Sequence, residues 1–174
     1  MSVSQFNLSS GQRAERKLLI TVAEWTEGSS PVREILGTRT EDSSIEYNPD
    51  VETTTDILGI NYTDLNKTQP QQDFDPYLVL GGSALGAKLN DIRRRNAVSE
   101  LDQFTVYIIT AFVGTTGAYE AEKHTNCTIV YNSIGGDTNV NFPISVYYSN
   151  KITVGTVDKL ASDFVFTSSS SISN

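Results

Sequence analysis

Apolar and polar side chains alternate along several stretches of the chain, with the period typical of β-strands. In residues 17–25 and 104–113 both faces of the pattern are apolar, which predicts inner strands covered on both sides. In residues 140–148 only one face is apolar, which predicts a strand with one buried and one wet face. Pro143 lies in this stretch and has no N–H to donate, so we expect this strand at a sheet edge or with a bulge.

Shorter segments of the same kind, separated by turn residues, extend the pattern. They lie at residues 44–47, 128–131, 151–157 and 164–166, with glycine-rich turns expected at 114–117 and 135–137. Several short strands separated by turn signals indicate a β-sandwich or a β-barrel. The length of 174 residues fits one domain, so we treat 1–174 as a single unit.

One segment has a helical period instead. Leu85, Leu89 and Ile92 recur at spacings of four and three, which places them on one face of a helix. Ser83 precedes them as a candidate N-cap, and three arginines follow in the last turns, where cations suit the negative end of the helix dipole. We expect one helix over 84–96, packed on the flank of the sheets, with its arginines as a solvated face or an anchor between subunits.

The two ends of the chain are polar. Residues 1–16 predict an N-terminal arm, and residues 167–174, with four consecutive serines, predict a flexible C-terminal tail unless a neighbour orders it.

The net charge is concentrated in one segment. The chain has 13 Lys and Arg against 21 Asp and Glu, a net charge of −8 with His neutral. Residues 41–75 contain nine acidic side chains and one basic one, Lys67, while the remainder holds twelve of each. Prolines and polar residues in this segment predict a long acidic loop region over 41–76. Such a region either is a solvated loop or is a surface that repels polyanions or docks on a basic partner.

Residues with catalytic or metal-binding patterns are scarce. In residues 81–88 an alanine separates the second glycine from the lysine, so the run departs from a phosphate-binding loop. His124 and Cys127 are spaced like two metal ligands, but a closed zinc site needs four. One cysteine forms no internal disulfide, and no apolar run is long enough to span a bilayer. We therefore expect no enzyme, cofactor or metal, and synthesis in the cytosol. The acidic balance also argues against a protein that grips nucleic acid through its phosphates.

The order of these elements and three short segments resemble a known family. The segments are EDSSIEYNPDVE at 41–52, TDILG at 55–59 and DFDP at 73–76, just before the helix. The first two are similar to the second-strand region of major tail proteins, or tail tube proteins, of long-tailed bacteriophages of Gram-positive hosts, and DFDP ahead of the helix also fits that family. The resemblance covers roughly residues 18–157.

The resemblance implies a mainly β fold in which two antiparallel sheets pack as a sandwich, with one flanking α-helix, an extended loop and terminal arms. It implies six subunits per ring, with inner sheets joined into a continuous barrel, and rings stacked into a hollow tube that carries DNA into the host. The implied partners are copies of the chain itself, a tape-measure protein and other tail proteins, with transient, non-specific passage of DNA and no membrane. The implied location is the virion tail, assembled in the host cytoplasm.

The acidic region would then supply contacts between rings or would line the lumen. Its candidate contact residues are Asp50, Glu52, Asp56, Asp64, Lys67 and Asp73. An acidic lumen would repel the DNA phosphates and let the genome slide.

Two other functions remain open at this point. The chain could be a β-sandwich module that binds a carbohydrate or a receptor, which predicts a small particle with solvent-facing aromatic residues in a cleft. It could also be another tail component of the same fold, such as a terminator or the inner tube of a contractile injection system.

Overall fold

The computed structural model describes residues 6–172, and within them the fold is mainly β with one α-helix. The strands are β1 (Leu19–Glu27), β2 (Ser30–Ile35), β3 (Ile45–Glu46), β4 (Asp50–Thr55), β5 (Asn61–Lys67), β6 (Gln71–Phe74), β7 (Phe104–Thr115), β8 (Ala118–Tyr131), β9 (Ile144–Tyr147), β10 (Ile152–Val157) and β11 (Phe166–Ile172). The helical segments are α1 (Ala84–Arg95) and two 3-10 turns, η1 (Arg16–Leu18) and η2 (Val98–Glu100).

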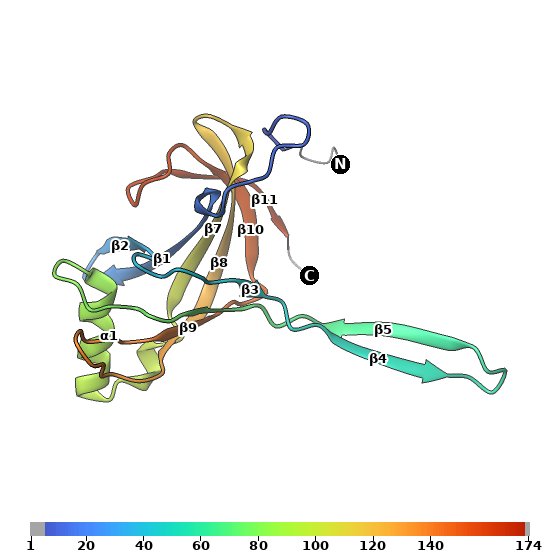
Figure 1. Cartoon of the computed structure of the whole chain (residues 1–174), viewed down its shortest axis with the longest axis horizontal. Helices are drawn as coiled ribbons and strands as arrows, with labels where there is room; N and C mark the ends of the chain where they lie inside the picture. Colours follow the sequence, from blue (N-terminus) through green and yellow to red (C-terminus); the bar gives the residue numbers. More distant parts are fainter. Residues whose placement is uncertain (1–5, 173–174) are drawn as a thin grey trace.

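Nine of the strands belong to one antiparallel hydrogen-bonded sheet that branches and folds back on itself at β8. The first half of β8 pairs with β10, and its second half, Thr128–Tyr131, pairs with β9. Asn126 lies between the two halves with a left-handed φ of 59°. The bend produces two layers, β2-β1-β7-β8-β10-β11 and β8-β9-β6-β3 (Figure 1). The expected pair of packed antiparallel sheets is therefore present, joined by one shared strand.

The main core lies between these two layers and α1. Trp25 of β1 and Phe104 of β7 contribute from one layer, Phe74 and Ile144 from the other, and Leu89 from the helix, all of them buried. A buried hydrogen bond from Thr21 Oγ1 to Gln72 Oε1, 2.9 Å long, also joins the layers.

The opposite face of β1 and β7 has a second core. Val22, Tyr107 and Ile109 are covered there by Val157 and by Phe164 of the loop that follows β10. The prediction that β1 and β7 are inner strands, apolar on both faces, is confirmed, since β1 lies between β2 and β7, and β7 lies between β1 and β8.

The helix also follows its local signals. The Ser83 hydroxyl accepts a hydrogen bond from Gly86 N at 3.1 Å, and Asn96 closes the helix in a left-handed conformation. Leu85, Leu89 and Ile92 are fully buried, as their spacing predicts.

Three sequence predictions differ from the structure. The strand over 140–148, expected at an edge or with a bulge, is shorter and lies inside the sheet in unbroken register, because Pro143 precedes β9 and so removes no donor from its ladders with β6 and β8. The tail expected to be flexible from residue 167 forms β11, because the edge of β10 offers its backbone a partner; residues 173–174 lie outside the described part. The loop region 41–76 contains four strands, β3 to β6.

The N-terminal arm is described from Phe6 onward, and residues 1–5 of the predicted segment lie outside the described part. Phe6 forms a β-bridge with Val113, and Asn7 N donates to Phe112 O at 3.0 Å. The N-terminal arm therefore runs against the end of β7.

Candidate assembly interface

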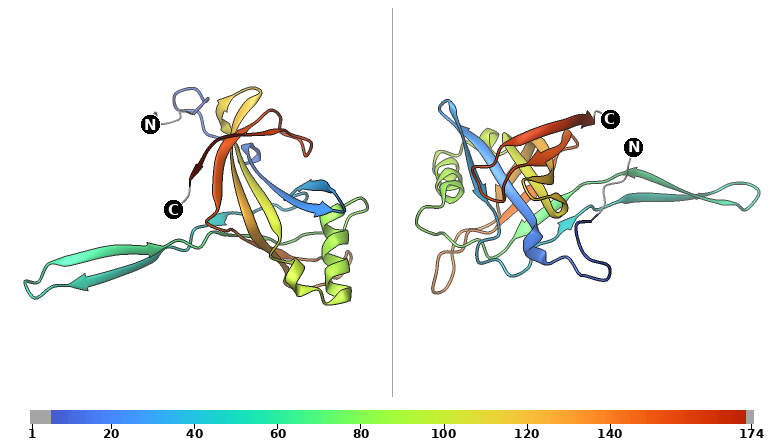
Figure 2. Two further views of the ribbon diagram at one scale, coloured as in Figure 1. Left: turned by 180° about the vertical axis from the view of Figure 1, so that it is seen from behind. Right: turned by 90° about the horizontal axis from the view of Figure 1, so that it is seen from above.

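A two-stranded hairpin projects from the body of the protein. We call this hairpin, residues 50–67, the arm. Its strands β4 and β5 form a sheet of their own, separate from the nine-stranded one. Every residue of both strands is exposed. Figures 1 and 2 show the arm extending beyond the sandwich along the longest axis of the molecule. An isolated two-stranded hairpin is marginally stable at best in water, so the arm is a segment that a partner surface would stabilise.

The two faces of the arm differ in chemistry. The register places Val51 opposite Leu65 and Glu52 opposite Asp64. Since adjacent side chains point to opposite faces of a strand, the first pair lies on an apolar face and the second on an acidic face. One threonine pair, Thr53 and Thr63, continues the apolar face, and Val51 and Leu65 are 53% and 61% exposed. Like charges directly opposite each other destabilise a hairpin, so the acidic face favours a cationic partner.

The end of the arm is shaped by one carboxylate. Asp56 Oδ1 accepts hydrogen bonds from the backbone N–H groups of Leu58 and Ile60 at 2.8 and 2.9 Å, and Oδ2 accepts one from the Tyr62 hydroxyl at 3.2 Å. The bond from Ile60, followed by those from Leu58 and Tyr62, lowers the pKa of Asp56. The turn held in this way presents Ile57, fully exposed, and Leu58, 78% exposed, to solvent. We call Ile57, Leu58 and Ile60 the apolar tip.

The root of the arm is fixed to the body. Gln69 N donates to Tyr47 O at 2.8 Å, and Tyr148 N donates to Pro70 O at 3.0 Å. Directly after this root, β6 enters the core with Gln72 and Phe74 buried. The arm is thus a continuation of core strands.

Five of the six predicted contact residues lie on the arm. Glu52 and Asp64 face each other on its acidic face, and Asp50 pairs in register with Lys67 at its root. Asp56 is committed to the turn. Asp73 lies on β6 of the body, where its carboxylate accepts a hydrogen bond from the Gln71 side chain at 3.0 Å.

The apolar tip and the apolar face were absent from the predicted contact set. Their signals are present in the sequence as alternating valine, threonine and leucine residues on either side of the turn at 56–60. The acidic residues interspersed over 41–75 make this segment resemble a charged loop, which obscures the alternation.

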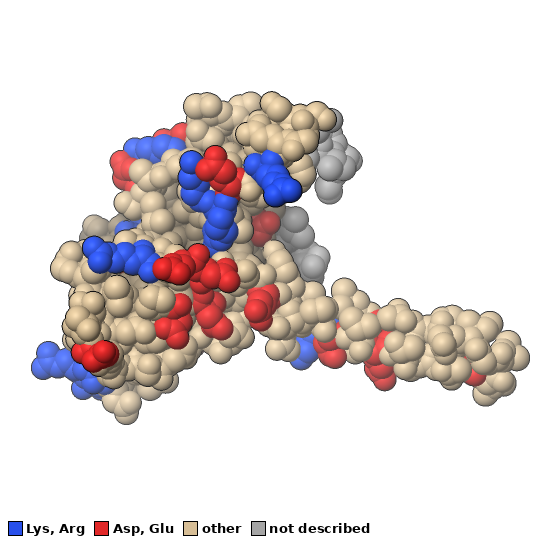
Figure 3. All heavy atoms as spheres, viewed as in Figure 1, with Lys and Arg blue, Asp and Glu red and all other residues tan. Residues whose placement is uncertain are grey.

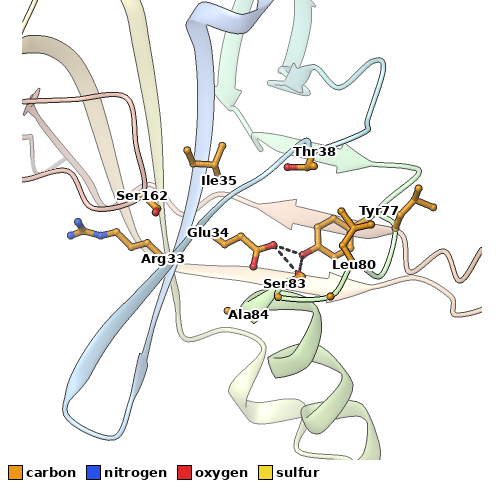
Figure 4. A pocket seen from close by; sticks show the side chains of 12 residues that line it. Arg33, Glu34, Ile35, Thr38, Tyr77, Leu80, Ser83, Ala84 and Ser162 are labelled. Carbon is orange, nitrogen blue, oxygen red and sulfur yellow. Dashed lines mark hydrogen bonds between the residues drawn. The ribbon is translucent and has the colours of Figure 1, made fainter.

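A hollow of about 330 Å³ lies at the N-terminus of α1 (Figure 4). Glu34 of β2 points into it and accepts hydrogen bonds from Tyr77 Oη at 2.8 Å, Ser83 Oγ at 2.9 Å and Leu85 N at 2.9 Å. Burial is the main cause that raises the pKa of Tyr77 above its ordinary value. The protein's own carboxylate therefore occupies the helix N-terminus where a bound phosphate would otherwise be favoured.

The His124 and Cys127 pair lies inside β8 and is buried. His124 makes hydrogen-bond contacts with Ser149 O at 3.1 Å and with Glu122 Oε2 at 3.2 Å, and burial raises the pKa of the Cys127 thiol. Within residues 6–172, no group of three His, Cys, Asp or Glu side chains is arranged to hold a metal ion.

In the described part of the chain, no helix has the length and apolar character needed to cross a membrane. No protein-family model and no curated protein matches the chain. Among solved structures, a chain in the 6-fold symmetrised cryo-EM structure of the anti-feeding prophage baseplate superposes with a TM-score of 0.46 and 10% identity. That superposition covers 84% of this chain and 97% of the other. A likeness at this level carries no argument about function, which has to come from the chain's own geometry.

Proposed function

We propose that this chain is a non-catalytic structural subunit of a bacteriophage tail tube. Copies of it assemble into stacked rings around a channel through which DNA is ejected into the host. In the family that the sequence resembles, a ring holds six subunits. The observation that carries the proposal is the arm, an 18-residue hairpin in which every residue except Asp56 of the turn is exposed and whose tip is apolar.

In a lone subunit the arm leaves apolar side chains in water, whereas in an assembly a neighbour can bury them. It contributes nothing to either core, yet it exposes six large apolar side chains, which are Val51, Ile57, Leu58, Ile60, Tyr62 and Leu65. Covering each such side chain in an interface is worth roughly 1.5–3 kcal/mol. A projecting segment of this kind fits a protein that is completed by its neighbours.

The free sheet edges support the same function. Within the described residues, β2, β3 and β11 each have one edge without a strand partner. Such edges are an aggregation hazard in a lone β-protein, and closing a ring of subunits removes it.

The charge distribution fits a channel protein that DNA passes without binding. The net charge of −8 comes entirely from residues 41–75, so the arm and its root repel DNA phosphates. The partners would be copies of the chain, a tape-measure protein within the tube and other tail proteins. The site of action would be the virion tail, after assembly in the host cytoplasm.

The test is assembly by the purified full-length chain with and without its arm. Light scattering coupled to size exclusion, together with negative-stain electron microscopy, should show rings or tubes for the natural sequence. A variant in which two glycines replace residues 50–67 should stay folded and monomeric, because the removed side chains belong to neither core. Small monodisperse particles from the natural sequence at all concentrations would contradict the proposal and favour a binding module.

A further inference from the structure

A second apolar surface lies beside α1, in the half of the molecule away from the arm. It is a groove of about 330 Å³ lined by Val79, Gly86, Ala87, Ile134, Val140 and Phe142. Its walls are open to solvent, since Val79, Ile134 and Val140 are 48%, 46% and 50% exposed. The groove floor includes small residues of the helix, which leaves room for side chains from outside. We call this surface the α1 groove.

The helix that forms one wall of the groove ends in cations. Gly86, Asn90 and Arg93 follow each other at spacings of four and three, so they lie along one stripe of α1. A hydrogen bond of 2.9 Å from Arg93 Nη2 to Asn90 Oδ1 confirms that Arg93 continues this stripe. Arg93 and its neighbour Arg94 are exposed, and neither forms an ion pair with any described residue.

We propose that the apolar tip of one copy inserts into the α1 groove of another copy, with Glu52 and Asp64 of the arm set against Arg93 and Arg94. This inference rests on the proposed self-assembly and names the surface that receives the arm. Each half of the contact is complementary: an exposed apolar tip faces an exposed apolar groove, and a pair of carboxylates faces two arginines that form no ion pair with a described residue.

The spacings on the two surfaces agree. At about 3.4 Å per strand residue, Glu52 lies ~10 Å behind Thr55, the last strand residue before the tip. At about 1.5 Å per helical residue, Arg93 lies ~10 Å from Gly86 in the groove. The strand between Glu52 and the base of the tip is therefore about as long as the helix between Arg93 and Gly86, so the acidic pair can reach the arginines when the base of the tip lies at Gly86.

The two surfaces also lie where a repeating contact requires them. Figure 1 shows α1 and the tip of the arm at opposite ends of the longest axis. Figure 3 shows a group of basic side chains at the α1 end, besides others on the upper part of the body, and several acidic side chains along the arm. A contact between two different patches of identical chains is head-to-tail. Each copy that joins leaves one free patch at the end of the assembly, so the contact can repeat from copy to copy.

The charge part of the contact is tested by reversal and exchange. Arg93→Glu with Arg94→Glu should raise the critical concentration for assembly by about tenfold or more, because two attractive pairs become repulsive. Glu52→Lys with Asp64→Lys should do the same. The variant carrying all four changes should recover the natural critical concentration, and circular dichroism should show all three folded, since the four positions are exposed.

The apolar part is tested by cross-linking. Leu58→Cys combined with Ala87→Cys should give disulfide-linked ladders under mild oxidation in the full-length chain. Leu58→Cys combined with Ala161→Cys is the matched control, because Ala161 is also an exposed alanine but lies on the loop after β10. Ladders only with Ala87→Cys support the proposal.

The outcomes separate this inference from the proposed function. If the natural chain forms tubes, but reversal has no effect, or the four-fold exchange fails to recover assembly, or the control cross-links equally well, then the α1 groove is the wrong receptor and the tail tube proposal stands. If the natural chain never assembles and Leu58→Cys with Ala87→Cys gives no ladder, both are wrong.

Discussion

The apolar tip provides the sharpest energetic prediction. Ile57 is fully exposed and Leu58 is 78% exposed in the single chain, so replacing both with serine removes no packing from the subunit. In an assembly that buries them, each substitution loses roughly 1.5–3 kcal/mol of apolar burial per contact. The sum, about 3–6 kcal/mol, corresponds to a contact weakened by roughly a hundredfold to ten-thousandfold at 1.4 kcal/mol per factor of ten.

The assay compares stability with assembly in the same samples. Urea unfolding of the monomer should give the same free energy for the Ile57→Ser, Leu58→Ser variant as for the natural chain, within about 0.5 kcal/mol. Sedimentation across a concentration series should show the critical concentration for assembly raised by the factor given above. Val165→Ser is the control, since Val165 is 63% exposed but lies away from the arm and should leave assembly unchanged. An unchanged critical concentration for the tip variant would refute burial of the tip.

Three further predictions concern the arm, the helix and the end of β7. Because hydrogen bonds lower the folded-state pKa of Asp56, its cap is intact at neutral pH and is lost as pH falls through that lowered value; the NMR shift of the Ile60 amide should titrate below the usual aspartate range, and not at all in Asp56→Asn. Glu34→Ala leaves the Leu85 N–H and two hydroxyls without their acceptor and should lower the free energy of urea unfolding by about 1–3 kcal/mol, with Glu34→Gln less affected. Gly114→Ala, near the end of β7, should cost ~1–3 kcal/mol or more in the same measurement, because φ is +89° and the new Cβ would lie 2.4 Å from a backbone oxygen of Ala118; a loss below ~0.5 kcal/mol would contradict this backbone geometry.

Local signals explain what the sequence predicted well. The helix over 84–96 has its cap residue, its apolar spacing and its terminal cations within one continuous segment, so no distant contact is needed to recognise it. The inner strands β1 and β7 were likewise predictable, because apolar side chains on both faces require cover on both sides. The layers and the helix on their flank follow from these elements.

Partners distant in sequence explain what was missed. The serines of β11 carry little β signal, and the strand exists because β10 offers hydrogen bonds that are indifferent to side-chain type. β9 can lie between β6 and β8 because its first paired residue, Ile144, comes directly after Pro143. The local sequence pattern does not show at which residue the pairing begins.

The projecting arm was predicted by its location in the sequence more than by its structure. The acidic residues correctly marked the segment that leaves the body, because charge excludes that segment from a core. The split of the arm into an acidic face with Glu52 and an apolar face with Val51 depends on strand register, and so does the role of Asp56 as a turn cap. Register is set by the pairing of β4 with β5, and the sequence alone left that pairing unassigned.

The way the arm joins the body has a mechanical consequence. β6 follows the arm directly and holds Phe74 in the core, while its backbone is bonded to β3 on one side and β9 on the other. Because ladder bonds run perpendicular to the strands, tension along the arm strains the bonds of both ladders together and does not peel them apart one after another. A pulling force on the tip therefore loads the two ladders of β6 in shear. The root of the arm at Asn48 and Gln69 lies outside both ladders, so its hydrogen bond would break before theirs under such a pull.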